Sequence, residues 1–231
     1  MTERTKHYEK EVSSLNMKMM DFLVGVENLF EKTLFAIQSG DENTVIEIEQ
    51  MDDYFDALDM QIQQTAFDII AKYQPLADDL RFVVAMIGLS IDLERIADEC
   101  VNIAQLNRHV QRTIESFSSW KTLNEMIKNV LVMFQEIVEA VRNSDLQLAI
   151  KVWQRDDEVD KLHTEGHEKL IELACGEHDP RKMRIYLEEA FLIRHLERIA
   201  DHITNVAEKL YFIKTGEQLK VVMGKKASNV S

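Results

Sequence analysis

Helix-breaking residues are scarce in this chain, whose 231 residues include two prolines and seven glycines. Proline lacks a backbone N–H donor and has a fixed φ angle, and glycine loses more backbone entropy on folding than any other residue. Both residues therefore usually interrupt helices, and their scarcity leaves few positions at which a helix must end. The composition predicts an all-α fold built from long helices.

Cysteine is also scarce, and no apolar run is long. The two cysteines, Cys100 and Cys175, exclude a disulfide framework and favour a reducing compartment. The longest apolar run, residues 82–91, is far shorter than the roughly 20 residues that cross a bilayer. The N-terminal residues also lack the apolar core of a signal peptide. These absences predict a cytoplasmic protein with no direct membrane insertion.

Positive charge is in deficit, because 27 Lys and Arg residues stand against 41 Asp and Glu residues, for a net charge of −14. Such a chain has little bulk attraction for nucleic acid or anionic lipid, so we expect no nucleic-acid partner. The sequence also lacks a phosphate-binding glycine loop, a nucleophile elbow and the Cys/His spacing of a zinc site. The sequence therefore contains no common motif that indicates a catalytic or nucleotide-binding site.

The sequence present is organised as two similar halves. The hexapeptide LERIAD occurs at 93–98 and again at 196–201. Other residues recur at an offset of 104 or 105, namely Asp41 with Asp145 and Pro75 with Pro180. A nearly constant offset indicates an internal duplication. Apolar residues at alternating spacings of three and four predict three helices in each half.

We predict two tandem antiparallel three-helix bundles, with six long helices in total. The first repeat covers residues 1–112, the second covers 113–216, and 217–231 form a flexible tail. The junction between the repeats falls at 110–119. Pro75 and Pro180 are expected to open the third helix of their respective repeats, because proline is accepted in the first turn.

Acidic residues four apart recur on apolar helix faces. Glu94 and Asp98 lie about 40° apart on a helical wheel, and Ile87 and Val101 fall within roughly 20° of Glu94. The acidic pair therefore continues an apolar stripe. Three further pairs of acidic residues have the same i,i+4 spacing. The four pairs form a set of eight residues: Asp52, Asp56, Glu94 and Asp98 in the first half, and Asp156, Asp160, Glu197 and Asp201 in the second.

Carboxylates that converge on a partly apolar surface repel one another unless they are protonated or bridged by cations. Facing oxygen ligands suit hard or borderline metals, so iron, manganese, magnesium, calcium and zinc are all candidates. The alternative is a solvated face on which Arg95 and Arg198 neutralise the acids. A ferritin-like di-iron site would need E-x-x-H pairs, and the sequence offers one D-x-x-H, at Asp160 and His163. Redox catalysis is therefore disfavoured.

These motifs resemble the PhoU family of phosphate-signalling regulators. The resemblance covers residues 8–216 and rests on LERIAD followed by Asn102 or Asn205, and on the DDEVD segment at 156–160. It implies multinuclear iron or zinc clusters, held by the eight acidic residues. Matching positions differ at His195, which stands where the first half has Asp92. Asp53 and Asp157 lie beside the proposed ligands.

The resemblance implies a regulator, and not an enzyme, that represses the phosphate-starvation response and restrains phosphate uptake. Its implied partners are the ATPase subunit of the phosphate ABC transporter and a sensor histidine kinase. We further expect a homodimer. Two alternative functions remain open at the level of sequence. One is a carboxylate-rich bundle that binds or stores metal, and the other is a structural helical adaptor without metal.

Overall fold

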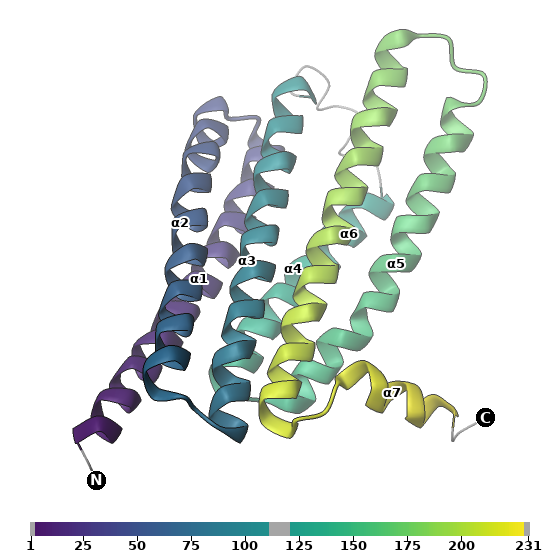
Figure 1. Ribbon diagram of the computed structural model, residues 1–231. Coiled ribbons are helices and arrows are strands. Elements are labelled where there is room, and N and C mark those ends of the chain that lie inside the picture. The colour runs from purple at the N-terminus through teal and green to yellow at the C-terminus, as the bar shows by residue number, and fades with distance from the viewer. Residues whose placement is uncertain (1–2, 111–120, 229–231) are drawn as a thin grey trace.

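The computed structural model describes residues 3–110 and 121–228, and every regular element in these ranges is an α-helix. The helices are α1 (Glu3–Ser39), α2 (Glu42–Tyr73), α3 (Ala77–Val110), α4 (Lys121–Asn143), α5 (Leu146–Ala174), α6 (Pro180–Thr215) and α7 (Leu219–Ser228). Helix α7 is much shorter than the helices before it (Figure 1). The all-α prediction is confirmed.

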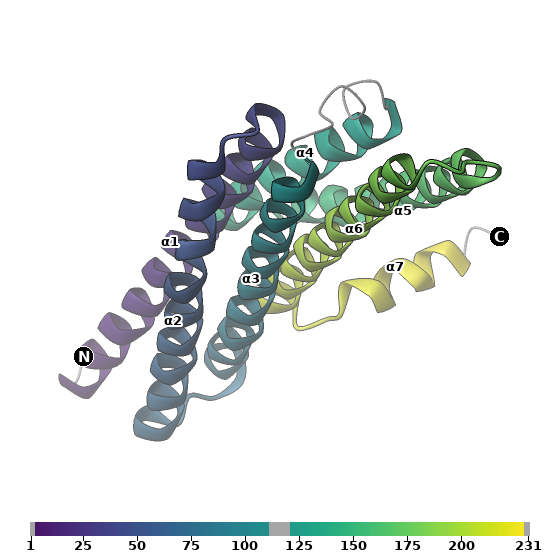
Figure 2. The same ribbon diagram turned by 90° about the horizontal axis from the view of Figure 1, so that it is seen from above.

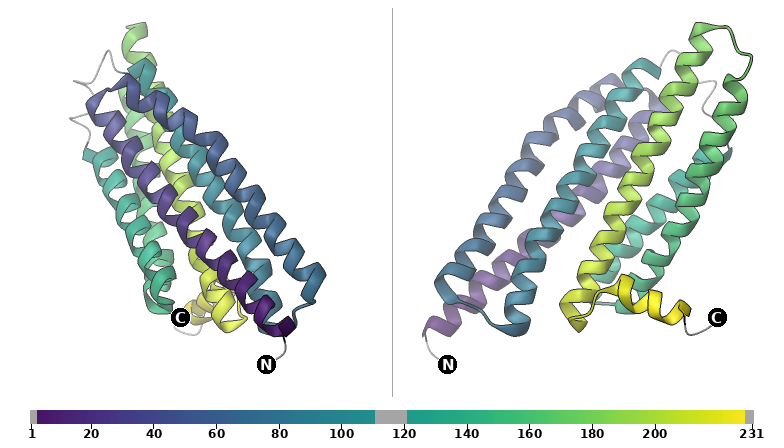
Figure 3. Two further views of the ribbon diagram at one scale, coloured as in Figure 1. Left: turned by 90° about the vertical axis from the view of Figure 1, so that its left-hand side faces the viewer. Right: turned by 45° about the vertical axis from the view of Figure 1, so that its right-hand side comes forward.

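The long helices form two layers (Figures 1 and 2). Helices α2, α3, α6 and α5 lie side by side in one layer, and α1 and α4 pack behind them (Figure 3). Helices α1–α3 make up unit 1, and α4–α6 make up unit 2. The two units adjoin through α3 and α6, which contact each other in the middle of the front layer. The predicted pair of three-helix bundles is confirmed.

The buried residues of both units form one continuous hydrophobic core. Phe22 of α1 stacks on Phe55 of α2 within unit 1, with their ring centroids 5.7 Å apart. Phe30 of α1 stacks on Phe134 of α4 at 5.9 Å, and this contact joins the two units. Since burial of apolar area is the main favourable contribution to folding, the shared core stabilises the packing of α3 against α6.

Side-chain caps fix several helix starts. Asp41, Asp145 and Asp179 are the N-caps of α2, α5 and α6, and each accepts a hydrogen bond from the backbone N–H two residues later. Gly40 ends α1 with a φ of 69°, a conformation that glycine adopts without steric cost. The recurrence of Asp41 and Asp145 therefore reflects equivalent helix starts in the two units.

The start of α3 differs from the prediction. Pro180 opens α6 as expected, directly after the N-cap Asp179. Pro75 does not open α3, which begins two residues later at Ala77. The residue before Pro75 is Gln74, which adopts a left-handed conformation (φ 53°) and closes α2 by donating to the carbonyl of Ile70. Gln74 therefore ends one helix and does not cap the next.

The segment after Gly216, which we expected to be a flexible tail, forms helix α7 in the structure. Leu219 at the start of α7 is fully buried, which attaches this end of the helix to the bundle. Figure 2 shows α7 on the front side of α5 and α6. Of the predicted junction 110–119, all but its first residue lies outside the described residues.

Candidate metal centre

The two acidic pairs of unit 1 face each other across α2 and α3. Asp52 and Asp56 from α2 and Asp98 from α3 each place a carboxylate oxygen within 4.8 Å of the other two. Among the described residues, these three are the one group of potential metal ligands that converges so closely. Glu94 lies beside them, close enough for the charges of Asp98 and Asp56 to raise its pKa. The four predicted residues of unit 1 therefore lie in one acidic cluster.

Negative charge is unfavourable at this site. Burial, followed by the charge of Asp98, raises the pKa of Glu94 from 4.5 to about 7. Burial also raises the pKa values of Asp52 and Asp98, and the charge of Asp56 contributes to both rises. A bound cation would reverse this effect, because it stabilises the ionised carboxylates that coordinate it. The electrostatics of the cluster therefore fit a metal ion.

Arg95 neutralises the cluster only in part. Its Nε lies 3.3 Å from Glu94 Oε2, and its Nη1 lies 3.1 Å from Asp98 Oδ2. The Arg95 side chain is 51% exposed, and ion pairs this exposed contribute little. One turn beyond Asp56, Asp59 has a buried Oδ1 with no hydrogen-bond partner. An orphaned buried oxygen beside three converging carboxylates fits a cation better than it fits a solvated face.

Unit 2 repeats the acidic site with a different geometry. Burial, followed by the charges of Asp160 and Asp201, raises the pKa of Asp156 from 3.8 to about 7. Asp156 Oδ1 is buried and has no hydrogen-bond partner. Burial also raises the pKa values of Glu197 and Asp201. The four residues thus influence one another, although no three of them bring ligand atoms within 4.8 Å, as the unit 1 group does.

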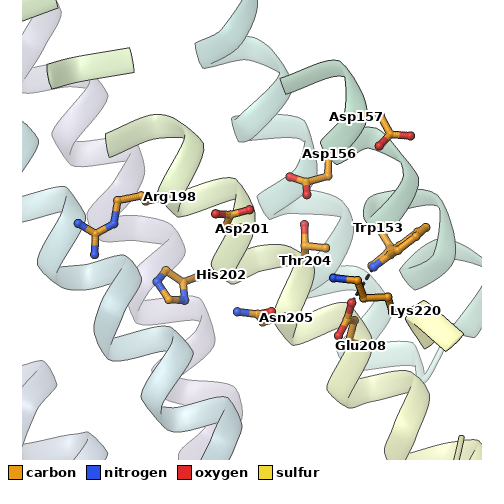
Figure 4. Close-up of a pocket in the computed structure, with 10 residues that line it drawn as sticks. All are labelled: Trp153, Asp156, Asp157, Arg198, Asp201, His202, Thr204, Asn205, Glu208 and Lys220. Carbon is orange, nitrogen blue, oxygen red and sulfur yellow. Dashed lines mark hydrogen bonds between the residues drawn. The ribbon is translucent and has the colours of Figure 1, made fainter. Parts of the chain in front are cut away.

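A pocket of about 380 Å³ opens beside the unit 2 carboxylates (Figure 4). It is lined by Trp153, Asp156, Asp157, Arg198, Asp201, His202, Thr204, Asn205, Glu208 and Lys220. Lys220 comes from α7, and the Trp153 indole N–H donates to Glu208 across α5 and α6 at 2.9 Å. A water molecule occupies about 30 Å³ in the liquid, so this volume has room for a hydrated ion.

Polar contacts between α3 and α6, which the sequence did not predict, join acidic side chains of unit 1 to polar and basic side chains of unit 2. We call this interface between the two units the α3–α6 seam. Asp92, which is 5% exposed, accepts hydrogen bonds from His202 at 3.0 Å, from Asn205 at 3.1 Å and from Lys209. Burial alone would raise the pKa of Asp92, but these hydrogen bonds hold it below its usual value. One unit therefore supplies the charge that stabilises a buried acid of the other.

The second seam contact mirrors the first. Glu99, which is 2% exposed, lies 2.5 Å from His195 and 3.0 Å from Arg198. His195 occupies the position in unit 2 that Asp92 occupies in unit 1, and His202 corresponds in the same way to Glu99. This pairing explains why unit 2 has a histidine at 195 where unit 1 has Asp92, because an aspartate at 195 would place a second negative charge against Glu99. The available signal was the seven-residue spacing of these ionisable residues, which places them on one helix face.

A search against known families gives a repeated match. The PhoU domain model matches residues 19–106 and again residues 123–210. The chain belongs to the PhoU family. Both matches contain a complete set of four acidic residues. Their starts are 104 residues apart, one residue more than the 103 that separates the LERIAD copies. The family resemblance and the duplication are confirmed.

Relatives of this PhoU chain are similar over almost their whole length. The phosphate-specific transport system accessory protein PhoU homolog of Caulobacter vibrioides is 33% identical over 220 residues, which are 95% of each chain. A crystal structure of PhoU from Pseudomonas aeruginosa is 27% identical with a TM-score of 0.80. The phosphate transport system regulatory protein PhoU from Streptococcus pneumoniae is 25% identical with a TM-score of 0.82. Each structural match covers 92% of this chain and 99% of the other.

These PhoU relatives carry names that denote accessory and regulatory proteins of phosphate transport. Within the described residues of the present chain, none of the helices combines the length and the hydropathy that a membrane span requires.

Proposed function

We propose that this chain is a negative regulator of phosphate uptake and of the phosphate-starvation response. The supporting observation is the presence of two PhoU domains in a chain that matches a phosphate-specific transport accessory protein over 95% of both lengths. The regulator acts in the cytoplasm, as a homodimer, by contacts with the ATPase subunit of the phosphate ABC transporter and with a sensor histidine kinase.

Metal ions bound on the acidic helix faces are part of the proposed function. Iron or zinc clusters would be held by Asp52, Asp56, Glu94 and Asp98 in unit 1 and by Asp156, Asp160, Glu197 and Asp201 in unit 2. The convergence of Asp52, Asp56 and Asp98 supports this role, as do the unpartnered oxygens of Asp59 and Asp156. Bound metal would supply positive charge where four carboxylates repel one another. It would also tie α2 to α3 and α5 to α6.

The regulatory function can be tested in a bacterium that lacks its own PhoU-family protein and carries a reporter for a phosphate-starvation promoter. We expect the chain to lower both the reporter signal and phosphate uptake in phosphate-rich medium. His178→Gln, a change in an exposed loop residue, is the matched control and should act like the wild type. A reporter that stays fully active, despite wild-type levels of soluble protein, would overturn the proposal.

The purpose of the metal can be tested separately with purified protein. Removal of metal by a chelator should weaken binding to the ATPase subunit, measured by co-purification. If circular dichroism shows that the chelated protein unfolds, the metal stabilises the bundle. If the chelated protein stays folded and loses only its partner, the metal forms part of the docking surface. Full binding by folded, metal-free protein would remove the metal from the proposed function.

A further inference from the structure

Helix α5 carries two histidines one turn apart beside the unit 2 site. His163 and His167 are both half-buried, and their ring centroids lie 4.6 Å apart with the planes at 71°. Residues at this i,i+4 spacing project from the same helix face. A His-x-x-x-His pair on a helix can bind one metal ion through two imidazole nitrogens, because the helix holds both rings at one site. The helix therefore places two imidazole rings close enough for one metal ion to reach both.

Unit 1 offers an internal comparison. With the offset of 104 between the PhoU domains, His163 corresponds to Asp59 and His167 corresponds to Gln63. In unit 1 this pair is joined by its own hydrogen bond, since Gln63 Nε2 donates to Asp59 Oδ2 at 2.7 Å. In the described part of unit 2 the two imidazoles meet by ring contact, with no hydrogen bond between them. The duplication has thus placed nitrogen donors where unit 1 has an amide and a carboxylate.

The surroundings of the histidine pair favour a cation. Asp160 lies on the same helix face, within about 60° of both histidines on a helical wheel. Asp201 lies within electrostatic reach across the α5–α6 interface. Burial raises the pKa of Asp201, and the charge of His163 partly offsets that rise.

The protonation of His167 also suits a ligand. Burial, followed by the charges of His163 and Arg194, lowers the pKa of His167 and so favours the neutral ring, which is the form that binds metal. Arg194 is a nearby positive charge that would repel a bound metal ion. Its side chain is exposed, so solvent screens this repulsion.

We propose that His163 and His167 chelate a borderline divalent transition metal, such as Zn²⁺, next to the acidic site of unit 2. Imidazole ligands favour zinc, copper and nickel over magnesium and calcium, whereas the unit 1 site offers only oxygen ligands. The two units of this chain therefore differ in metal preference. The proposal extends the metal binding proposed above, but the chelate depends on nitrogen donors that unit 1 lacks.

The first test uses wild-type protein labelled with ¹⁵N at its histidines, to which Zn²⁺ alone is added. The imidazole resonances of His163 and His167 should shift together at one equivalent, while those of His178 in the exposed loop should not. Because this measurement needs no substitution, misfolding of a variant cannot affect it. If Zn²⁺ binds and leaves both pairs of ring nitrogens unchanged, the chelate does not exist.

The second test exploits the duplication. His163→Gln with His167→Gln should weaken binding of one Zn²⁺ equivalent by about tenfold or more, as measured by isothermal titration calorimetry. The reciprocal change, Asp59→His with Gln63→His, should create a second site of this type in unit 1.

Failure of this proposal can be distinguished from failure of the carboxylate sites. If Asp98→Ala and Asp201→Ala lose metal while the double glutamine variant binds Zn²⁺ like the wild type, the chelate is wrong and the carboxylate sites stand. If only the double glutamine variant loses Zn²⁺, the chelate stands and the carboxylate proposal fails.

Discussion

The replacement Glu94→Gln tests whether repulsion between carboxylates destabilises the metal-free protein. Glutamine has nearly the shape of glutamate and carries no charge at any pH. In the folded protein the pKa of Glu94 lies at about 7, compared with an ordinary value of 4.5. Below pH 4.5 the carboxyl is protonated in both the folded and the unfolded chain, so it contributes nothing to the difference between them.

The loss of stability that Glu94 causes in the folded protein appears as the pH rises. Between pH 4.5 and 7 the unfolded carboxyl has ionised while the folded one still holds its proton, so stability falls, and above pH 7 the cost is constant. A rise of about 2.5 in pKa corresponds to roughly 3 kcal/mol. The Glu94 side chain is 18% exposed. Solvent screening therefore reduces the expected cost, and we take it as about 1.5 kcal/mol.

Urea unfolding in the presence of a chelator measures this effect. At pH 8 the variant should be more stable than the wild type by about 1.5 kcal/mol, whereas at pH 5 the two should agree within about 0.5 kcal/mol. With metal bound the sign should reverse, because glutamine removes a ligand oxygen that carries charge. Equal stabilisation at both pH values, or destabilisation of the metal-free variant at pH 8, would show that repulsion at Glu94 does not destabilise the metal-free protein.

Two further predictions concern the seam and the helix caps. His195→Asp places a carboxylate against the buried Glu99 and should lower the free energy of unfolding in urea by roughly 3 kcal/mol. Adding Glu99→His should restore most of that loss. Absence of rescue would contradict the pairing. Asp145→Ala removes the N-cap of α5 and should lower the free energy of unfolding by about 1 kcal/mol in the same assay. Asp157→Ala, at an exposed position of that helix, should not lower it. Equal losses in the two variants would argue against the cap.

Much of the fold could be predicted from the sequence because its signals are local. The capping aspartates Asp41 and Asp145, the glycine at 40 and the proline at 180 lie at helix ends and act within a few residues. Spacing along a single helix also placed Glu94 and Asp98 on one face. The facing of α2 and α3 followed from their short connection, which requires antiparallel neighbours.

The remaining features depend on contacts between distant residues. Duplication predicts two equal units and does not specify which faces of the units meet, so the pairing of Asp92 with His202 required the structure. The late start of α3 depends on Gln74, whose left-handed conformation no local pattern indicated. The burial of Leu219, which attaches α7, depends in the same way on the assembled bundle.

Metal content measures most directly whether the acidic helix faces bind metal. Purified wild-type protein, loaded with iron or with zinc and then freed of unbound ions, should retain metal in elemental analysis. Asp98→Ala and Asp201→Ala should each retain less, and the variant with both changes should retain only the histidine-bound zinc equivalent. Wild-type protein at background under every loading condition, or a double variant with undiminished metal, would contradict the account.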